Sequence, residues 1–162
     1  MAENCRRIAS FSVDHDWITP GIYLSRVDGD AATYDLRTRT PNAGSYMDNR
    51  TMHSVEHMFA TMVRNSALGN EVIYFGPMGC QTGFYLLMRT EVPKEQVLEL
   101  VKSTLRRILA YDGPMFGAAR KECGNYRNLD LNDAKQECAA YLAALERRDW
   151  DFSYPQGEEA AQ

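Results

Sequence analysis

The spacing of hydrophobic residues changes along the chain, and this change limits the folds that it can adopt. Residues 22–27 and 33–39 are rich in β-branched and aromatic residues, and the turn-forming sequence Asp28-Gly29-Asp30 lies between them. Farther along, apolar residues recur every three or four positions, as they do on one face of a helix. They are Met52, Val55, Phe59, Met62 and Val63, and they follow possible helix caps at Asp48 and Asn49. The chain therefore begins with a pair of strands and continues with an amphipathic helix.

The second of these strands should have one polar face. Tyr34 and Leu36 alternate with Asp35 and Arg37, and alternate residues of a strand point to opposite faces of a sheet. A cationic residue on a sheet that covers a core is unexpected unless a ligand or a partner meets it. The ordinary interpretation is that Arg37 is a solvated strand residue.

The second half of the chain continues this mixture of strands and helices. Residues 71–75 and 83–89 are predicted to be strands, joined by a glycine-containing turn. Two further helices are expected, one over residues 93–111 and one that begins near Asn132 or Asp133. The residues expected to face inward are Val97, Leu100, Val101, Leu105 and Ile108 in the first helix, and Ala134, Cys138, Tyr141, Leu142 and Leu145 in the second. Because strands and helices do not alternate regularly, we predict an α+β fold in which an antiparallel sheet packs against helices.

The composition is that of an ordinary globular protein. The chain has 162 residues, a net charge of −4 and 44% hydrophobic residues, and it contains no apolar run near the ~20 residues that span a membrane. The net charge disfavours a nucleic-acid partner, and no apolar segment of a secretion signal is recognisable after the first residues. We therefore expect a cytoplasmic protein without a membrane or nucleic-acid partner. It should form one domain, residues 1–162, with loose ends at about 1–7 and 153–162.

Two of the three histidines lie four residues apart in the sequence His53-Ser54-Val55-Glu56-His57. On a helix, residues with this spacing share one face, and two imidazoles can then bind one metal ion. Glu56 lies beside the pair. The alternative is two ordinary surface histidines at this spacing by chance. Two imidazoles are too few for a tight site, so a third protein ligand is expected.

The four cysteines are expected to be reduced, because a chain of this length shows no recognisable secretion signal. The absence of a C-x-x-C pair argues against a zinc finger and a thioredoxin-like motif. Cys123 is the best third metal ligand, since it lies in a predicted loop beside a glycine; the alternative is a small buried hydrophobic residue. Two histidines and a cysteine would leave a fourth position for water or substrate, as in catalytic sites. Cys5 and Cys138 are assigned no role, because one lies near the N-terminus and the other on the core face of a helix.

Cys80 lies in the turn Pro77-Met78-Gly79-Cys80-Gln81-Thr82-Gly83. The flanking glycines permit a tight backbone and the close approach of a ligand. A nearby divalent cation would favour the thiolate, which is the reactive form of the side chain. The alternative is a turn cysteine without a role. His15, the third histidine, carries little information by itself.

Together these segments resemble the S-ribosylhomocysteine lyases, bacterial enzymes that make the precursor of a furanone-type quorum-sensing signal. The matching segments keep the order and rough spacing of that family from about residue 8 to 145. They are Ser10-Phe11, Asp14-His15, Tyr34-Asp35-Leu36-Arg37, Pro41-Asn42, His53-Ser54-Val55-Glu56-His57, Pro77-Met78-Gly79-Cys80-Gln81-Thr82-Gly83-Phe84-Tyr85, Cys123-Gly124 and Ala134-Lys135. Two places differ from the family: Tyr74 and Gly76 stand where it usually has an acidic residue and a serine, and Arg127-Asn128-Leu129 stands where a histidine often follows.

The resemblance implies a homodimeric α+β fold with two equivalent active sites at the subunit interface. It implies that His53, His57 and Cys123 bind one divalent metal ion per subunit. In the family this ion is ferrous iron, and zinc and cobalt are tolerated; the softness of the ligands is compatible with iron or zinc.

The resemblance also implies a carbon–sulfur lyase whose substrate is S-ribosylhomocysteine. Glu56 and Cys80 match the acid/base pair of the family. Ser10, His15 and Arg37 match residues that contact the substrate and that the partner subunit supplies. The sugar carbonyl would migrate from C1 to C3, and β-elimination would then give homocysteine and 4,5-dihydroxy-2,3-pentanedione. The second product is the autoinducer precursor, and homocysteine returns to the methyl cycle.

Two other functions are compatible with the residues alone. His-x-x-Glu-His is also the inverted zincin motif of metallohydrolases, in which the glutamate activates a metal-bound water. That interpretation requires a glutamate as the third ligand, for which Glu122 is the best downstream residue. A non-enzymatic metal-binding module would instead require a closed site of four ligands, for which His15 and Cys80 are the spare residues.

Overall fold

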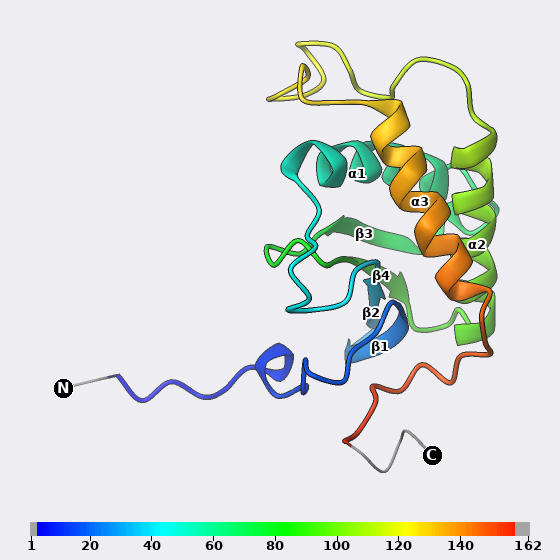
Figure 1. Cartoon of the computed structure of the whole chain (residues 1–162). Helices are drawn as coiled ribbons and strands as arrows, with labels where there is room; N and C mark the ends of the chain where they lie inside the picture. The colour runs from blue at the N-terminus through cyan, green and yellow to red at the C-terminus, as the bar shows by residue number, and fades with distance from the viewer. Residues whose placement is uncertain (1–2, 158–162) are drawn as a thin grey trace.

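The computed structural model describes residues 3–157, in which a four-stranded antiparallel sheet forms one layer of the fold (Figure 1). Its strands are β1 (Gly21–Asp28), β2 (Ala31–Arg37), β3 (Val72–Pro77) and β4 (Gly83–Arg89), and their order across the sheet is β1-β2-β4-β3. Strands β1 and β2 form one hairpin, β3 and β4 form a second, and the two hairpins join through β2 and β4. The predicted α+β class and antiparallel sheet are confirmed.

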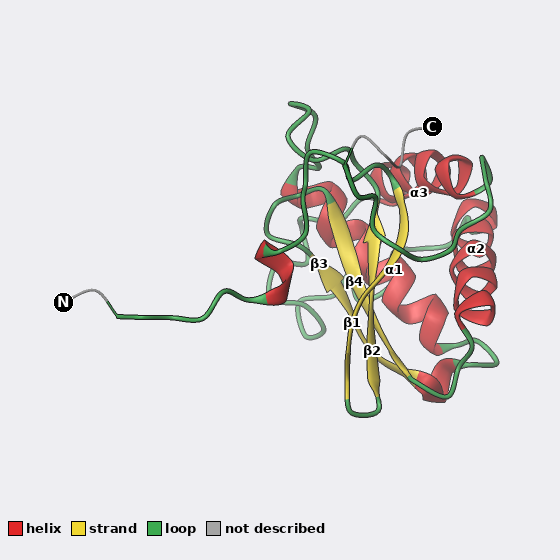
Figure 2. Cartoon of the chain, turned by 90° about the horizontal axis from the view of Figure 1, so that it is seen from below, coloured by secondary structure: helices red, strands yellow, loops and turns green. Residues whose placement is uncertain are grey.

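Helices α1 (Asn49–Arg64), α2 (Lys94–Ala110) and α3 (Leu131–Leu145) pack together on one side of this sheet (Figures 1 and 2). Helix α1 contacts β3 and α3 contacts β1, whereas α2 packs on the other two helices. Two short 3-10 helices, η1 (Ala9–Phe11) and η2 (Gly69–Glu71), lie outside this layer. The core between helices and sheet includes a run of stacked rings, with Phe59 and Phe75 4.3 Å apart and Phe75 and Phe84 5.1 Å apart between centroids. Burial of each such side chain contributes about 1.5–3 kcal/mol, so this run anchors α1 on β3 and β4.

Most predicted elements are present, and the differences have local causes. The residues predicted to face inward on α2 and α3 are all buried. Strand β2 ends at Arg37 rather than at residue 39, because the backbone N–H groups of Thr38 and Arg39 both turn to the carbonyl of Thr82. Helix α3 begins at Leu131, before the predicted start, because Asp130 caps it by accepting from the N–H of Asp133 at 2.9 Å.

The two ends of the described chain differ in how they pack against the rest of the molecule. Residues 3–9 are exposed and lead away from the body of the molecule (Figure 1). After α3 the chain returns along β1, where the N–H of Leu24 donates to the carbonyl of Phe152 at 2.8 Å. Tyr154 then stacks on Tyr23 with 4.9 Å between the ring centroids. The prediction of a loose end from residue 153 is therefore wrong at Tyr154; the predicted loose residues 1–2 and 158–162 lie outside the described part of the chain.

Among residues 3–157, every helix is too short or too polar to cross a lipid bilayer.

Candidate active site

Helix α1 presents both histidines of the predicted metal site. Its N-terminus is capped by Asp48, whose carboxylate accepts from the N–H of Thr51 at 2.7 Å. The apolar stripe of the helix is buried in the core, whereas His53, Glu56 and His57 are only partly buried on the neighbouring arc. Core packing therefore fixes the rotation of the helix and leaves these three polar side chains free to face a site.

The structure brings His53, His57 and Cys123 together. Their ligand atoms all lie within 4.8 Å of one another, and Sγ of Cys123 is 3.3 Å from Nε2 of His53. The two imidazole rings are 4.6 Å apart and nearly perpendicular, at 87°. Two nitrogen donors and one sulfur donor form a set that suits iron(II), zinc or cobalt.

Backbone carbonyls from the loop between α2 and α3 orient both imidazoles. Nδ1 of His53 donates to the carbonyl of Asn128 at 3.1 Å, and Nδ1 of His57 donates to that of Phe116 at 2.8 Å. A carbonyl oxygen can only accept, so each Nδ1 carries the proton and each Nε2 keeps a lone pair for a metal ion. The N–H of Asn125 also donates to Sγ of Cys123 at 3.4 Å. The protein atoms thus fit a bound divalent metal ion.

Gly117 allows the loop to pass this close to His57. Its backbone has φ +66°, and a Cβ at this position would lie 2.8 Å from Nδ1 of His57. We did not identify Phe116, Gly117 or Asn128 from the sequence. Every residue has a backbone carbonyl, so the amino-acid types of Phe116 and Asn128 do not reveal their role. A glycine in a predicted loop was the only indication in the sequence.

The turn that carries Cys80 is held by its own backbone. The N–H of Met78 donates to the carbonyl of Gly83 at 2.9 Å, and the N–H of Gln81 donates to the carbonyl of Met78 at 3.1 Å. Gln81 itself has φ +65°, a conformation that non-glycine residues adopt at some energetic cost. The carbonyl of Gln81 also accepts from the N–H of Met47 at 3.0 Å, which ties the turn to the segment that leads into α1. Cys80 is exposed at the tip of this structure.

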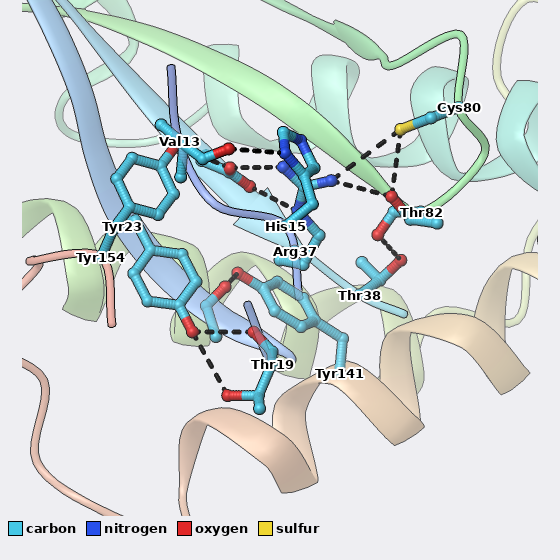
Figure 3. Close-up of polar contacts among 12 residues, drawn as sticks. Val13, His15, Thr19, Tyr23, Arg37, Thr38, Cys80, Thr82, Tyr141 and Tyr154 are labelled. Carbon is cyan, nitrogen blue, oxygen red and sulfur yellow. Dashed lines mark hydrogen bonds and ion pairs between the residues drawn. The ribbon is translucent and has the colours of Figure 1, made fainter. Parts of the chain in front are cut away.

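Arg37 lies directly against the Cys80 turn, within one chain (Figure 3). Its NH1 atom donates to Oγ1 of Thr82 at 2.8 Å and faces Sγ of Cys80 at 3.8 Å. Sγ of Cys80 is in turn 3.0 Å from Oγ1 of Thr82. The family resemblance implied that Arg37 approaches the site from the partner subunit. In the structure, however, the Arg37 and Cys80 side chains of the same chain are neighbours. A site that takes Cys80 from one subunit and Arg37 from the other is inconsistent with this contact.

The polar face predicted for β2 exists, but it is buried rather than solvated. Asp35 and Arg37 are 1% and 2% exposed, and the guanidinium donates to the carboxylate through NH2 at 2.6 Å and through Nε at 3.1 Å. Burial lowers the pKa of Arg37, but the charge of Asp35 and the hydrogen bonds to it outweigh this effect and raise the pKa overall. Arg37 is therefore a permanent cation beside Cys80.

Ser10 and His15 lie on the N-terminal segment, before β1. Ser10 belongs to η1 and is partly exposed. Nδ1 of His15 donates to the carbonyl of Val13 at 2.9 Å (Figure 3). Within residues 3–157, neither side chain hydrogen-bonds to Cys80, to Arg37 or to the metal cluster.

Fold and site together define an α+β protein with a candidate three-ligand metal centre. A sequence profile of the S-ribosylhomocysteinase (LuxS) family matches residues 8–151. The S-ribosylhomocysteine lyase of Borrelia garinii subsp. bavariensis is 37% identical over 156 residues, which cover 93% of this chain and 99% of that protein. The S-ribosylhomocysteine lyase of Finegoldia magna is 42% identical over 143 residues, 86% of this chain and 91% of its own length. The chain belongs to the S-ribosylhomocysteinase (LuxS) family, a family of carbon–sulfur lyases.

The site geometry bears on the two alternative functions as well. The carboxylate of Glu122, which an inverted zincin would need as a ligand, accepts instead from the N–H of Ala119 at 3.3 Å. In the described part of the chain the metal cluster consists of three residues, and neither His15 nor Cys80 joins it as a fourth ligand. Three protein ligands are the number that catalytic zinc sites typically have.

Proposed function

We propose that this protein cleaves the thioether of S-ribosylhomocysteine and releases homocysteine and 4,5-dihydroxy-2,3-pentanedione, the autoinducer precursor. The observation that carries the proposal is the convergence of His53, His57 and Cys123, in a chain whose residues 8–151 match the S-ribosylhomocysteinase family.

His53, His57 and Cys123 would hold one divalent metal ion per subunit, ferrous iron by analogy with the family. When bound, this ion supplies a Lewis acid for the oxygen atoms of the sugar. The carbonyls of Phe116 and Asn128 keep both imidazoles in the tautomer that such an ion needs.

Glu56 and Cys80 would move the protons. Migration of a sugar carbonyl requires removal of a proton from the neighbouring carbon and its return one carbon away, which a carboxylate and a thiolate can both perform. Once the carbonyl is at C3, loss of the C4 proton forms the C4–C5 double bond as the C5–S bond breaks. The electron pair leaves with homocysteine thiolate, so no external oxidant or reductant is needed. Arg37 places a positive charge 3.8 Å from the Cys80 sulfur.

A second copy of the chain would complete the site with Ser10 and His15. The segment that carries them begins with residues 3–9, which lead away from the body of their own chain (Figure 1). Its apolar residues Ile8 and Phe11 are 52% and 66% exposed, which is unfavourable in water and suits burial against another subunit. In this arrangement Arg37 and Cys80 come from the same chain, because they are in contact.

The decisive experiment is incubation of the purified, metal-loaded protein with S-ribosylhomocysteine, followed by a free-thiol assay. We expect thiol release by the wild type, and a loss of at least about 100-fold in Cys80→Ala and in Glu56→Gln with metal content unchanged. His57→Ala should instead lose most of its metal. Full activity of Cys80→Ala or Glu56→Gln would refute the acid/base roles, and an inactive wild type with full metal content would refute the function.

A further inference from the structure

We infer that Tyr154, in the segment that follows α3, is a positioning residue for the Cys80 thiol. It acts through Asp35 and Arg37, two side chains that are nearly inaccessible to solvent. Tyr154 lies beyond the segment of residues 8–151 that matches the family, so the family pattern does not account for it. The inference rests on the proposed role of Cys80 in catalysis.

A continuous chain of hydrogen bonds leads from Tyr154 to Cys80. The Tyr154 hydroxyl donates to Oδ2 of Asp35 at 2.7 Å. The same oxygen accepts from NH2 of Arg37 at 2.6 Å, and the opposite nitrogen, NH1, faces Thr82 and the Cys80 sulfur. The position of the Asp35 carboxylate thus sets the direction in which the guanidinium points, and Tyr154 supplies a third hydrogen bond to that carboxylate beside the two from Arg37.

Tyr154 is held firmly enough to act in this way. Its ring lies nearly parallel to that of Tyr23, at 16° and 4.9 Å between centroids. Tyr23 is itself fixed by packing, because it is 1% exposed. Two residues before Tyr154, the side chain of Phe152 is buried in the core and its carbonyl accepts from the N–H of Leu24.

The Tyr154 hydroxyl remains a donor over the working pH range. Burial raises its pKa, and the Asp35 carboxylate that it faces raises the pKa further. Without this donor, Oδ2 of Asp35 would keep only Arg37 as a partner. The carboxylate would then be free to turn, and the guanidinium would follow it away from Cys80, because a bidentate pair moves as a unit.

The other groups near Cys80 do not substitute for this arrangement. Thr82 contributes a neutral hydroxyl, and Tyr85 on β4 is close enough to the thiol and to Arg37 to interact through charge. Burial raises the pKa of Tyr85, with a further contribution from Asp35, so its phenol stays neutral. Arg37 is therefore the charged group whose direction beside the Cys80 sulfur depends on Asp35 and Tyr154.

The test compares Tyr154→Phe with Tyr23→Phe. Both variants keep the stacked rings and lose one hydroxyl, but only the first loses a bond to Asp35. Two quantities are measured: the rate at which iodoacetamide alkylates Cys80, followed on the Cys80 peptide by mass spectrometry over a pH series, and kcat and KM for thiol release.

We expect iodoacetamide to alkylate Cys80 of Tyr154→Phe about three- to tenfold more slowly than Cys80 of the wild type at neutral pH, and the two alkylation rates to converge at higher pH. The kcat of Tyr154→Phe should fall by a similar factor, with KM unchanged. Alkylation of Cys123 in the same samples should not change. The inference would be overturned if Cys80 were alkylated in Tyr154→Phe at the wild-type rate, or if Tyr23→Phe slowed the alkylation of Cys80 as much as Tyr154→Phe does. If the wild type released no thiol, the proposed function would fail, whereas the alkylation comparison would still decide the role of Tyr154.

Discussion

At the scale of single residues, the imidazoles of the metal centre depend on backbone carbonyls for their orientation. His53 and His57 each donate through Nδ1 to a carbonyl of the loop between α2 and α3. Such contacts fix the tautomer and raise the basicity of the ligand. Substitutions in this loop that leave His53, His57 and Cys123 in place should therefore still change the affinity for metal.

Gly117→Ala tests this dependence. The new Cβ would be 2.8 Å from Nδ1 of His57, and φ +66° is unfavourable for alanine, so the loop must move and the Phe116 carbonyl must withdraw. We expect metal affinity to fall by about 10- to 100-fold, measured by competition with a chelator. The matched control is Gly124→Ala, beside Cys123, where an added Cβ meets nothing within 4 Å. Equal affinities in the two variants would contradict the role of the loop.

At the scale of secondary structure, the strands and helices were predictable, whereas several contacts of the site were not. The histidine pair could be identified because helical spacing places residues four apart on one face, and the stripe from Met52 to Val63 fixes which face is free. The buried pair of Asp35 and Arg37 could not be identified, because alternation in a strand assigns residues to a face but does not show what covers that face. Tyr154 was missed for the same reason, since its position depends on contacts with β1 and β2 that are distant in sequence.

The cap of α1 makes the stability of the metal-bearing helix depend on pH. A hydrogen bond from the N–H of Thr51 lowers the pKa of Asp48. A carboxylate with a lowered pKa in the folded state stabilises the protein above its ordinary pKa of about 4, and this contribution is lost as the pH falls below that value. We expect Asp48→Ala to lower the free energy of unfolding by about 1 kcal/mol at neutral pH.

Asp48→Asn provides the control, because asparagine caps a helix about as well as aspartate but cannot titrate. Urea unfolding in the presence of a chelator should show the wild type slightly more stable than Asp48→Asn at pH 7, with the difference vanishing toward pH 3. A difference that is the same at both pH values would show that the charge of Asp48 contributes nothing to α1.

At the scale of the whole molecule, the contact between Arg37 and Cys80 determines which variants complement each other in a dimer. If His15 reaches the site of the other chain, a mixed dimer of His15→Ala and Cys80→Ala contains one intact site and one doubly altered site. Random exchange should restore about a quarter of wild-type activity, because half of the dimers are mixed and each has one good site. In mixtures of Arg37→Ala and Cys80→Ala every site carries one lesion, so we expect no recovery.

For both mixtures, the activity is measured as thiol release after subunit exchange, and mass spectrometry confirms that exchange has occurred. Recovery with Arg37→Ala and Cys80→Ala would mean that the two side chains serve different sites. The absence of recovery with His15→Ala and Cys80→Ala would mean that each chain builds its site alone.

The hydrogen bond between the N–H of Met47 and the carbonyl of Gln81 has a consequence for how this protein can diverge in sequence. It joins the segment that leads into the histidine-bearing helix to the turn that carries Cys80, and it uses main-chain atoms only. Any amino acid other than proline at position 47 supplies the same donor, and any residue at position 81 supplies the same acceptor. The side chains at these positions are instead limited by their surroundings, since Met47 is buried in the core and Gln81 has a positive φ. Substitutions that satisfy those two local limits therefore leave the link between the helix and the turn in place.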